Sequence, residues 1–185
     1  MSGLESKKRY SYWFAALGVL FFIYMTLGIS RPVLNYLIER NLRGLVVFVL
    51  LGAFFACIVY SVIKYNLLTK RNWPFFAIIA VAYGVSLNKF TVQPEEKIHF
   101  VEYGILAFLL YRALKIDIKN KIILCISSLV LIFMFGLGDE LIQKVLPNRY
   151  YDIRDVYLNF VSGALVISMM AFIVDVKRNQ IAKNI

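Results

Sequence analysis

A histidine, a glutamate and a tyrosine lie close together in a largely apolar stretch, where they could transfer protons or bind a charged group. His99, Glu102 and Tyr103 are spaced so that a helix places all three on one face. A carboxylate beside an imidazole orients the ring and favours its protonated form, while burial opposes protonation. The alternative is a hydrogen-bonded cluster that only packs helices together. We consider a functional role for the three residues equally well supported, because an ionisable group such as Glu102 is costly within a lipid-spanning helix.

Two adjacent acids lie near the end of the next apolar segment. A helix dipole disfavours negative charge close to the helix C-terminus, so Asp139 and Glu140 need a cation nearby. Arg149 and Arg154 in the following loop can supply that charge. Gln143 lies three residues beyond Glu140, on the same helix face. A network of loop salt bridges is the alternative, and we favour a site.

Further polar residues lead into the last apolar segment. Asp152 is suited to be a helix N-cap, and Asp155 would then be the third helical residue. Capping does not explain Asn159, which lies one turn deeper on the face of Asp155 and needs a partner inside a bundle. Gly163 and its small neighbours allow another helix to approach closely at this level.

The apolar residues around these side chains occur in blocks. Of 185 residues, 61% are hydrophobic and only 17% are charged, whereas a soluble domain is nearer half apolar and a quarter charged. Segments that cross hydrocarbon must satisfy their backbone internally, so these blocks should be helices. The sequence therefore predicts an all-α, polytopic transmembrane bundle of about six spans in a single domain, 1–185. The segments are roughly 12–29, 44–63, 73–88, 98–114, 122–137 (extendable to about 145, before Pro147) and 156–174.

Basic residues between these segments predict the orientation of the chain. They cluster before the first segment and after the second, fourth and sixth, which places all of them on one side if there are six spans. Both termini are then cytoplasmic, and the polar residues described above lie at the extracytoplasmic face. Arg31, Arg40 and Arg43 fall on the outer side as an exception, in a stretch that also predicts a short interfacial helix. The clusters are Lys7, Lys8 and Arg9; Lys64, Lys70 and Arg71; Arg112, Lys115, Lys119 and Lys121; Lys177, Arg178 and Lys183.

The same basic loops account for the formal net charge of +10. Such charges hold the cytoplasmic side at an anionic leaflet, so the predicted partner is the lipid bilayer and not nucleic acid. The two cysteines lie inside apolar blocks and suggest core residues. No cofactor is predicted, although Glu140, Asp155 and His99 are residue types that could hold a divalent cation.

The order and spacing of the polar residues resemble the VanZ family of bacterial membrane proteins. The matching residues are His99-Phe100 with Tyr103-Gly104, Glu140 with Gln143, then Arg149, Asp155, Asn159 and Gly163. The resemblance divides the domain into two N-terminal spans (1–72) and a VanZ-like core of four spans (73–176). Many family members carry Asp-Lys four residues before the histidine, where this chain has Glu95-Glu96.

The resemblance implies a multi-pass protein of the bacterial cell membrane that acts in the cell envelope. The family's named member is associated with resistance to the lipoglycopeptide teicoplanin. We therefore expect an extracytoplasmic site that binds or modifies an anionic lipid or a lipid-linked wall precursor. The candidate catalytic residues are His99, Glu140 and Asp155. The candidate substrate-binding residues are Glu102, Tyr103, Gln143, Arg149, Arg154 and Asn159.

Three classes of function stay open at this point. The residues above could catalyse a reaction on a lipid headgroup, relay protons in a coupled transporter, or bind without catalysis during assembly. No Ser or Cys in the sequence stands beside an obvious base, so no nucleophile favours the enzyme.

Overall fold

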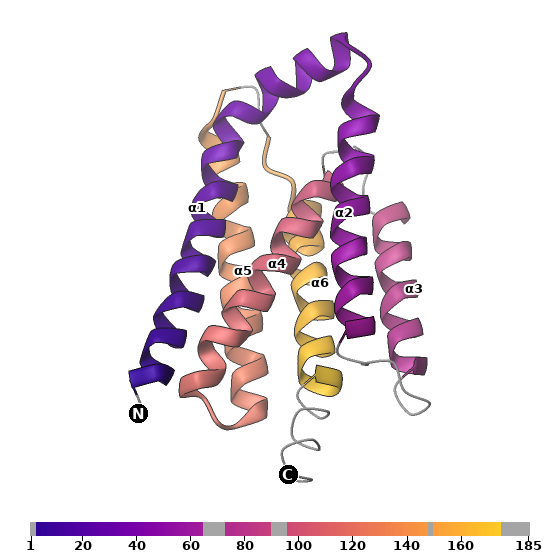
Figure 1. Ribbon diagram of the computed structural model, residues 1–185. Coiled ribbons are helices and arrows are strands. Elements are labelled where there is room, and N and C mark those ends of the chain that lie inside the picture. The colour runs from indigo at the N-terminus through magenta and orange to yellow at the C-terminus, as the bar shows by residue number, and fades with distance from the viewer. Residues whose placement is uncertain (1–2, 65–72, 90–95, 148–149, 175–185) are drawn as a thin grey trace.

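The computed structural model describes residues 3–64, 73–89, 96–147 and 150–174, and these residues form helices joined by short turns (Figure 1). Each predicted apolar segment coincides with one helix, so the predicted all-α fold is confirmed. The helices are α1 (Gly3–Glu39), α2 (Arg43–Lys64), α3 (Trp73–Lys89), α4 (Glu96–Asp117), α5 (Lys121–Val145) and α6 (Ile153–Met169), which continues into the π-helical turn η1 (Met170–Val174).

Three stretches of helix are long and apolar enough to cross a membrane, namely Glu5–Ile29, Lys121–Val145 and Ile153–Phe172. Large apolar side chains such as Phe14 and Phe48 are exposed on these and neighbouring helices, as expected of a surface that contacts lipid tails. The chain is therefore a membrane protein. Shorter apolar helical stretches lie in α2 and α3, and α4 is not among the three candidates, so the count of six spans stays a prediction.

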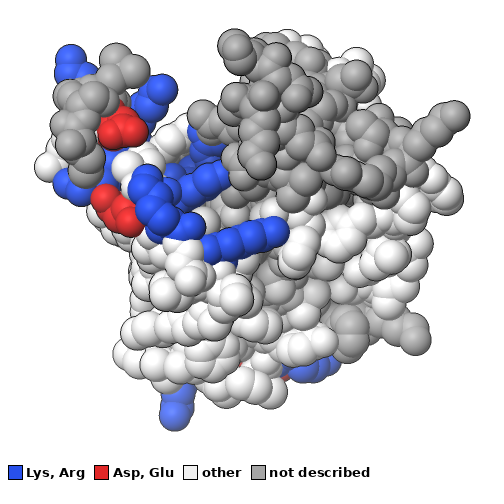
Figure 2. All heavy atoms as spheres, turned by 90° about the horizontal axis from the view of Figure 1, so that it is seen from below, with Lys and Arg blue, Asp and Glu red and all other residues white. Residues whose placement is uncertain are grey.

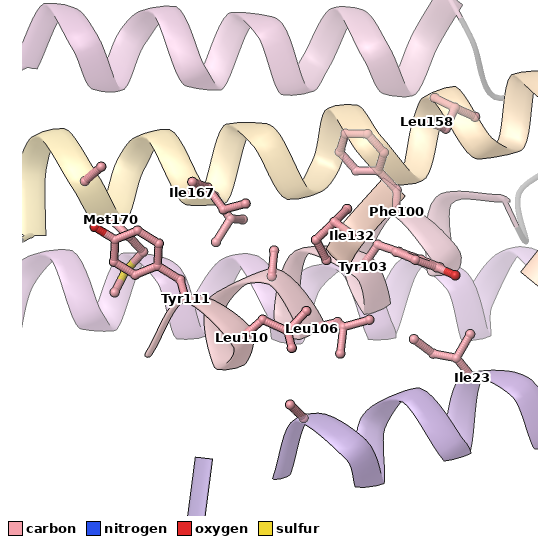
Figure 3. Packing of buried hydrophobic residues seen from close by; sticks show 14 of the residues in the cluster. Ile23, Phe100, Tyr103, Leu106, Leu110, Tyr111, Ile132, Leu158, Ile167 and Met170 are labelled. Atoms are coloured by element: carbon pink, nitrogen blue, oxygen red, sulfur yellow. The ribbon is translucent and has the colours of Figure 1, made fainter. Parts of the chain in front are cut away.

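Helix α4 lies at the centre of the bundle, between α1 and α6 and in front of α5 in the view of Figure 1. Much of its apolar surface is buried, although Ile105 and Phe108 are exposed. The buried residues of α4 are Phe100, Tyr103, Leu106, Ala107, Leu110, Tyr111 and Ala113. Figure 3 shows them packed against Ile132 of α5, Ile167 of α6 and Ile23 of α1. Lipid tails are as apolar as these side chains, so close van der Waals packing and contacts between polar residues hold α4 inside the bundle.

Small residues bring α4, α5 and α6 into close contact. A Cβ atom added at Gly163 of α6 would lie 2.7 Å from Cγ2 of Ile132. A Cβ atom at Gly104 of α4 would lie 3.2 Å from the Ser162 hydroxyl of α6. Close approach at Gly163 is what its sequence context predicted.

Helix α1 is longer than the predicted segment and bends at its far end (Figure 1). Pro32 lies inside this helix, and proline is a usual cause of such bends. The helix ends in a Schellman motif, in which Asn41 adopts a positive φ of 55° and the Leu42 N–H bonds to the Leu37 carbonyl at 2.8 Å. The predicted interfacial helix is thus a continuation of α1.

Lysine and arginine side chains gather at the end of the bundle where α1 begins, α4 ends and α5 begins (Figure 2). Arg9 forms an ion pair with Asp117 at 3.2 Å, and Arg112 donates a hydrogen bond to the Tyr12 hydroxyl at 2.7 Å. We call this the basic end. Lys70, Arg71, Lys177, Arg178 and Lys183, which the orientation argument also used, lie outside the described residues.

Candidate polar site between helices α4, α5 and α6

Those polar residues singled out in the sequence that the structure describes lie at the end of the bundle opposite the basic end. Helices α4 and α6 begin there and α5 ends there, as Figure 1 shows. The first turns of α4 and α6 therefore bring His99 and Asp155 to the level of Asp139 and Glu140, in the last turns of α5. His99 interacts electrostatically with Asp139 and Asp155, and Glu140 does so with Asp155. The three helices thus contribute to one electrostatic unit.

Glu140 is completely buried, and both of its carboxylate oxygens accept hydrogen bonds. Oε1 accepts the side-chain amide of Gln143 at 2.8 Å, and Oε2 accepts the backbone N–H of Asp152 at 2.8 Å. A buried carboxylate is stable only with such partners. The side chain therefore points into the protein and not toward lipid.

Asp139 is also buried, with 1% of its surface exposed. Its Oδ2 atom lies 3.3 Å from the Tyr103 hydroxyl of α4, which donates to it. The same hydroxyl lies 3.1 Å from the backbone carbonyl of Phe135, one turn earlier on α5. Tyr24 of α1 donates to that carbonyl as well, at 2.9 Å. The hydroxyl groups of Tyr24 from α1 and Tyr103 from α4 thus meet at one carbonyl group of α5.

His99 and Glu102 form an ion pair one turn into α4, with Nδ1 and Oε2 3.0 Å apart. Their side chains are 25% and 16% exposed, so this pair lies nearer the surface than Asp139 and Glu140. The spacing of three residues predicted this contact. Neither of the two atoms makes a hydrogen bond of good angle, so the contact is electrostatic.

Asp152 is the N-cap of α6, as predicted, and its Oδ1 accepts the backbone N–H of Arg154 at 2.9 Å. The Arg154 guanidinium also donates to both carboxylate oxygens, and this hydrogen bonding lowers the pKa of Asp152 below its usual range. The Arg154 side chain is 60% exposed. It therefore lies at the rim of the site, above the buried acids.

Asn159 is buried at the deeper edge of the site. Its Cβ lies 3.3 Å from where a side chain at Gly136 would begin, and the Tyr103 ring lies 3.7 Å from the same point. The absence of a side chain at Gly136 therefore allows Asn159 and Tyr103 to approach α5 together.

A family model described as VanZ/LLP1 matches residues 91–174. The chain is VanZ-like over these residues. The match begins just before α4 and ends with η1, so it contains α4, α5 and α6, between which the polar site lies. No curated protein and no solved structure matches the chain significantly. The prediction that a VanZ-like core starts at residue 73 stays a prediction, since α3 precedes the match.

Several predicted features of the VanZ-like region fall outside what the structure describes. Arg149, Pro94 and Glu95 lie outside the described residues, and the side chain of Glu96 is not described. Among the side chains that are described, no group of three His, Cys, Asp or Glu residues is placed to hold a metal ion.

Two residues of the site were not among the predicted site residues. The sequence indicated that Asp139 needs a cation nearby, and only the structure shows that it accepts a hydrogen bond from Tyr103. Tyr24 lies in α1, outside the VanZ-like region, and nothing about its position in the sequence suggests a contact with α5.

Proposed function

We propose that this VanZ-like chain is a cell-envelope protein that binds the headgroup of an anionic lipid or a lipid-linked wall precursor at the polar site. The observation that carries the proposal is the placement of Glu140. It is completely buried and held by Gln143 and Asp152, directly below the start of α6 and its exposed Arg154. A buried, oriented acid beneath an exposed arginine is suited to a ligand that has both a negative group and a hydroxyl or amine group.

The charge distribution supports an extracytoplasmic position for this site. Lysines and arginines gather at the opposite end of the bundle (Figure 2), and such residues favour the cytoplasmic side. We therefore place the polar site at the outer face of the bacterial cell membrane, with six spans and both termini inside. Envelope lipids and lipid-linked wall precursors present their headgroups at that face.

Within the site, the residues divide into a rim and an interior. Arg154 at the rim, with Arg149 from the adjoining loop, would contact a phosphate or carboxylate, because guanidinium groups bind such anions with two parallel hydrogen bonds. Glu140, His99 and Asp155 would exchange protons with a headgroup below. A change in teicoplanin sensitivity on loss of the protein would be a secondary effect of that envelope function.

An apolar layer makes the transport alternative less well supported. The buried polar residues of α6 end at Ser162, whose hydroxyl lies 3.4 Å from that of Tyr83. Below this level Leu106, Leu110 and Ile167 fill the bundle (Figure 3). A proton path to the basic end would have to pass these apolar side chains, and the buried polar side chains described there, Ser128 and Tyr111, carry hydroxyl groups and not the acids or histidine of the polar site.

The test measures lipid binding by the purified protein in detergent. Native mass spectrometry would compare retention of a polyprenyl pyrophosphate, phosphatidylglycerol and zwitterionic phosphatidylcholine. We expect preferential retention of one or both anionic lipids and weaker retention by the variant Arg154→Gln. Lys119→Gln, which removes one positive charge at the basic end, is the matched control and should bind normally. Equal retention of all three lipids by every variant would contradict the proposal.

The same experiment separates binding from chemistry. Extended incubation followed by mass analysis of the lipid reveals a product if the site catalyses a reaction. Lipid profiling of a deletion strain then shows whether a headgroup accumulates or disappears in the cell envelope.

A further inference from the structure

We propose that Tyr24 of α1 is a positioning residue of the polar site, which directs the hydroxyl hydrogen of Tyr103 to Asp139. This inference concerns how the site is completed by a helix outside the VanZ-like region. It does not depend on which headgroup the site binds.

The Phe135 carbonyl of α5 lies close to three hydrogen-bond donors. In a regular helix this oxygen accepts the N–H of Asp139, four residues later. The Tyr24 hydroxyl donates to it at 2.9 Å, and the Tyr103 hydroxyl lies 3.1 Å away. A carbonyl oxygen has two lone pairs. The helix N–H and Tyr24 use both, so the carbonyl is a poor acceptor for Tyr103.

Tyr103 has one hydroxyl hydrogen and two acceptors within reach. Besides the Phe135 carbonyl, Oδ2 of Asp139 lies 3.3 Å from its oxygen. While Tyr24 occupies the carbonyl, the hydrogen is directed to Asp139, where a hydrogen bond to a charged group is the stronger one. Without Tyr24, the carbonyl becomes available and the hydrogen is divided between the two acceptors.

A glycine in α5 makes room for the Tyr24 side chain. A Cβ atom at Gly138 would lie 2.8 Å from the Tyr24 hydroxyl oxygen, which is too close for the two atoms to coexist. Gly138 therefore provides the space in which the hydroxyl of α1 reaches the Phe135 carbonyl. The atom nearest to this added Cβ is the hydroxyl oxygen at the end of the Tyr24 side chain. Gly138→Ala would therefore displace that hydroxyl while α5 stays helical.

The experiment measures how readily Asp139 reacts with a hydrophobic carbodiimide, which modifies protonated carboxyl groups within membranes. Labelling of the full chain in detergent at one fixed pH is quantified by peptide mass spectrometry as the fraction of Asp139 that carries the label. We expect Tyr24→Phe to increase the labelling of Asp139 by about threefold. The free-energy change that corresponds to this factor is only part of the free energy that a hydrogen bond to a charged group contributes. Gly138→Ala should produce the same increase, and it tests the idea independently if Tyr24→Phe folds poorly.

Two further variants separate positioning from a general loosening of the bundle. Tyr103→Phe removes the donor itself, so the double variant Tyr24→Phe/Tyr103→Phe should label no more than Tyr103→Phe alone. Tyr12→Phe removes a hydroxyl of α1 at the basic end, so Asp139 in this variant should be labelled to the same extent as in the protein without substitutions. Unchanged labelling in Tyr24→Phe and Gly138→Ala, or additive effects in the double variant, would overturn the proposal.

Discussion

Glu140 on α5 accepts the backbone N–H of Asp152, the N-cap residue of α6, at 2.8 Å. In a capping box that N–H is bound by the third residue of the same helix. Here the third residue is Asp155, and the carboxylate comes instead from a different helix. The bond therefore joins the end of α5 to the start of α6, at the site where the buried acids gather.

The first prediction concerns the charge of Glu140. In Glu140→Gln the amide oxygen can still accept the Asp152 N–H, and a rotated Gln143 amide can accept the new N–H₂ group. We expect thermal stability in detergent to fall by about 1 kcal/mol or less, while lipid binding and the envelope phenotype are lost.

Glu140→Ala is the matched comparison for that variant. It removes both hydrogen bonds and leaves a space in the protein, so stability should fall by about 2–4 kcal/mol. A stable Glu140→Gln variant with normal lipid binding and normal lipoglycopeptide sensitivity would contradict the assigned role.

The ion pair between His99 and Glu102 can be tested by a double-mutant cycle. His99→Gln leaves Glu102 without its cation at a partly buried position, and we expect a loss of about 1–2 kcal/mol. Glu102→Gln added to it should recover most of that loss. Thermal unfolding of the single and double variants gives the coupling, and purely additive losses would show that the pair contributes nothing.

Contact between α5 and α6 depends on Gly163. Gly163→Ala forces a methyl group against the buried side chain of Ile132, so it should destabilise the protein by about 2 kcal/mol. Gly18→Ala is the control, because nothing lies within 4 Å of its added Cβ atom. Alanine favours helix over glycine, so Gly18→Ala should be neutral or stabilising. Equal effects of the two substitutions on unfolding temperature would be evidence against close packing at Gly163.

The orientation of the chain is accessible to cysteine labelling in intact cells. In a background with both native cysteines replaced by serine, Tyr150→Cys places an exposed thiol at the polar-site end, and Lys119→Cys places one at the basic end. A membrane-impermeant maleimide should label position 150 in intact cells and position 119 only after lysis. The reverse pattern would place the polar site in the cytoplasm.

Acid should loosen the start of α6. The hydrogen bonds from Arg154 depress the pKa of Asp152, so this carboxylate stabilises the fold above its unfolded pKa, and that contribution is lost as the pH falls through the lower folded value. The protection of backbone amides near residue 153 from hydrogen exchange, corrected for the intrinsic exchange rate at each pH, should therefore decrease below about pH 4, the ordinary range for aspartate. In Asp152→Asn, which keeps a capping side chain, the acid-dependent part should be absent.

The apolar pattern predicted the helices well, because each buried or lipid-facing segment is bounded by charged or helix-breaking residues. Asp152 was predictable as a cap, and α5 was correctly extended to Val145 because Pro147 is the first breaker. The continuation of α1 to Glu39 was missed, since proline usually ends a helix and here only bends it.

Contacts between distant helices were the part of the site that no local pattern could predict. The spacing of His99 and Glu102 fixes their distance within one helix, so the pair was predictable. The meeting of Tyr24 with Phe135 joins positions 111 residues apart. Such a contact depends on how the helices pack, and it leaves no periodic signal along the chain.

The central position of α4 has a consequence for membrane biogenesis. Its 22 residues include Lys97, Glu102, Arg112 and Lys115, and it lacks the apolar character of the three helices that could cross a bilayer alone. Insertion scales penalise such residues by about 3 kcal/mol each at the middle of an isolated helix and less near its ends. Helix α4 packs mainly against α1, which is synthesised earlier, and against α5 and α6, which are synthesised later. We therefore expect α4 to reach its final place only after α5 and α6 have emerged to pack against it.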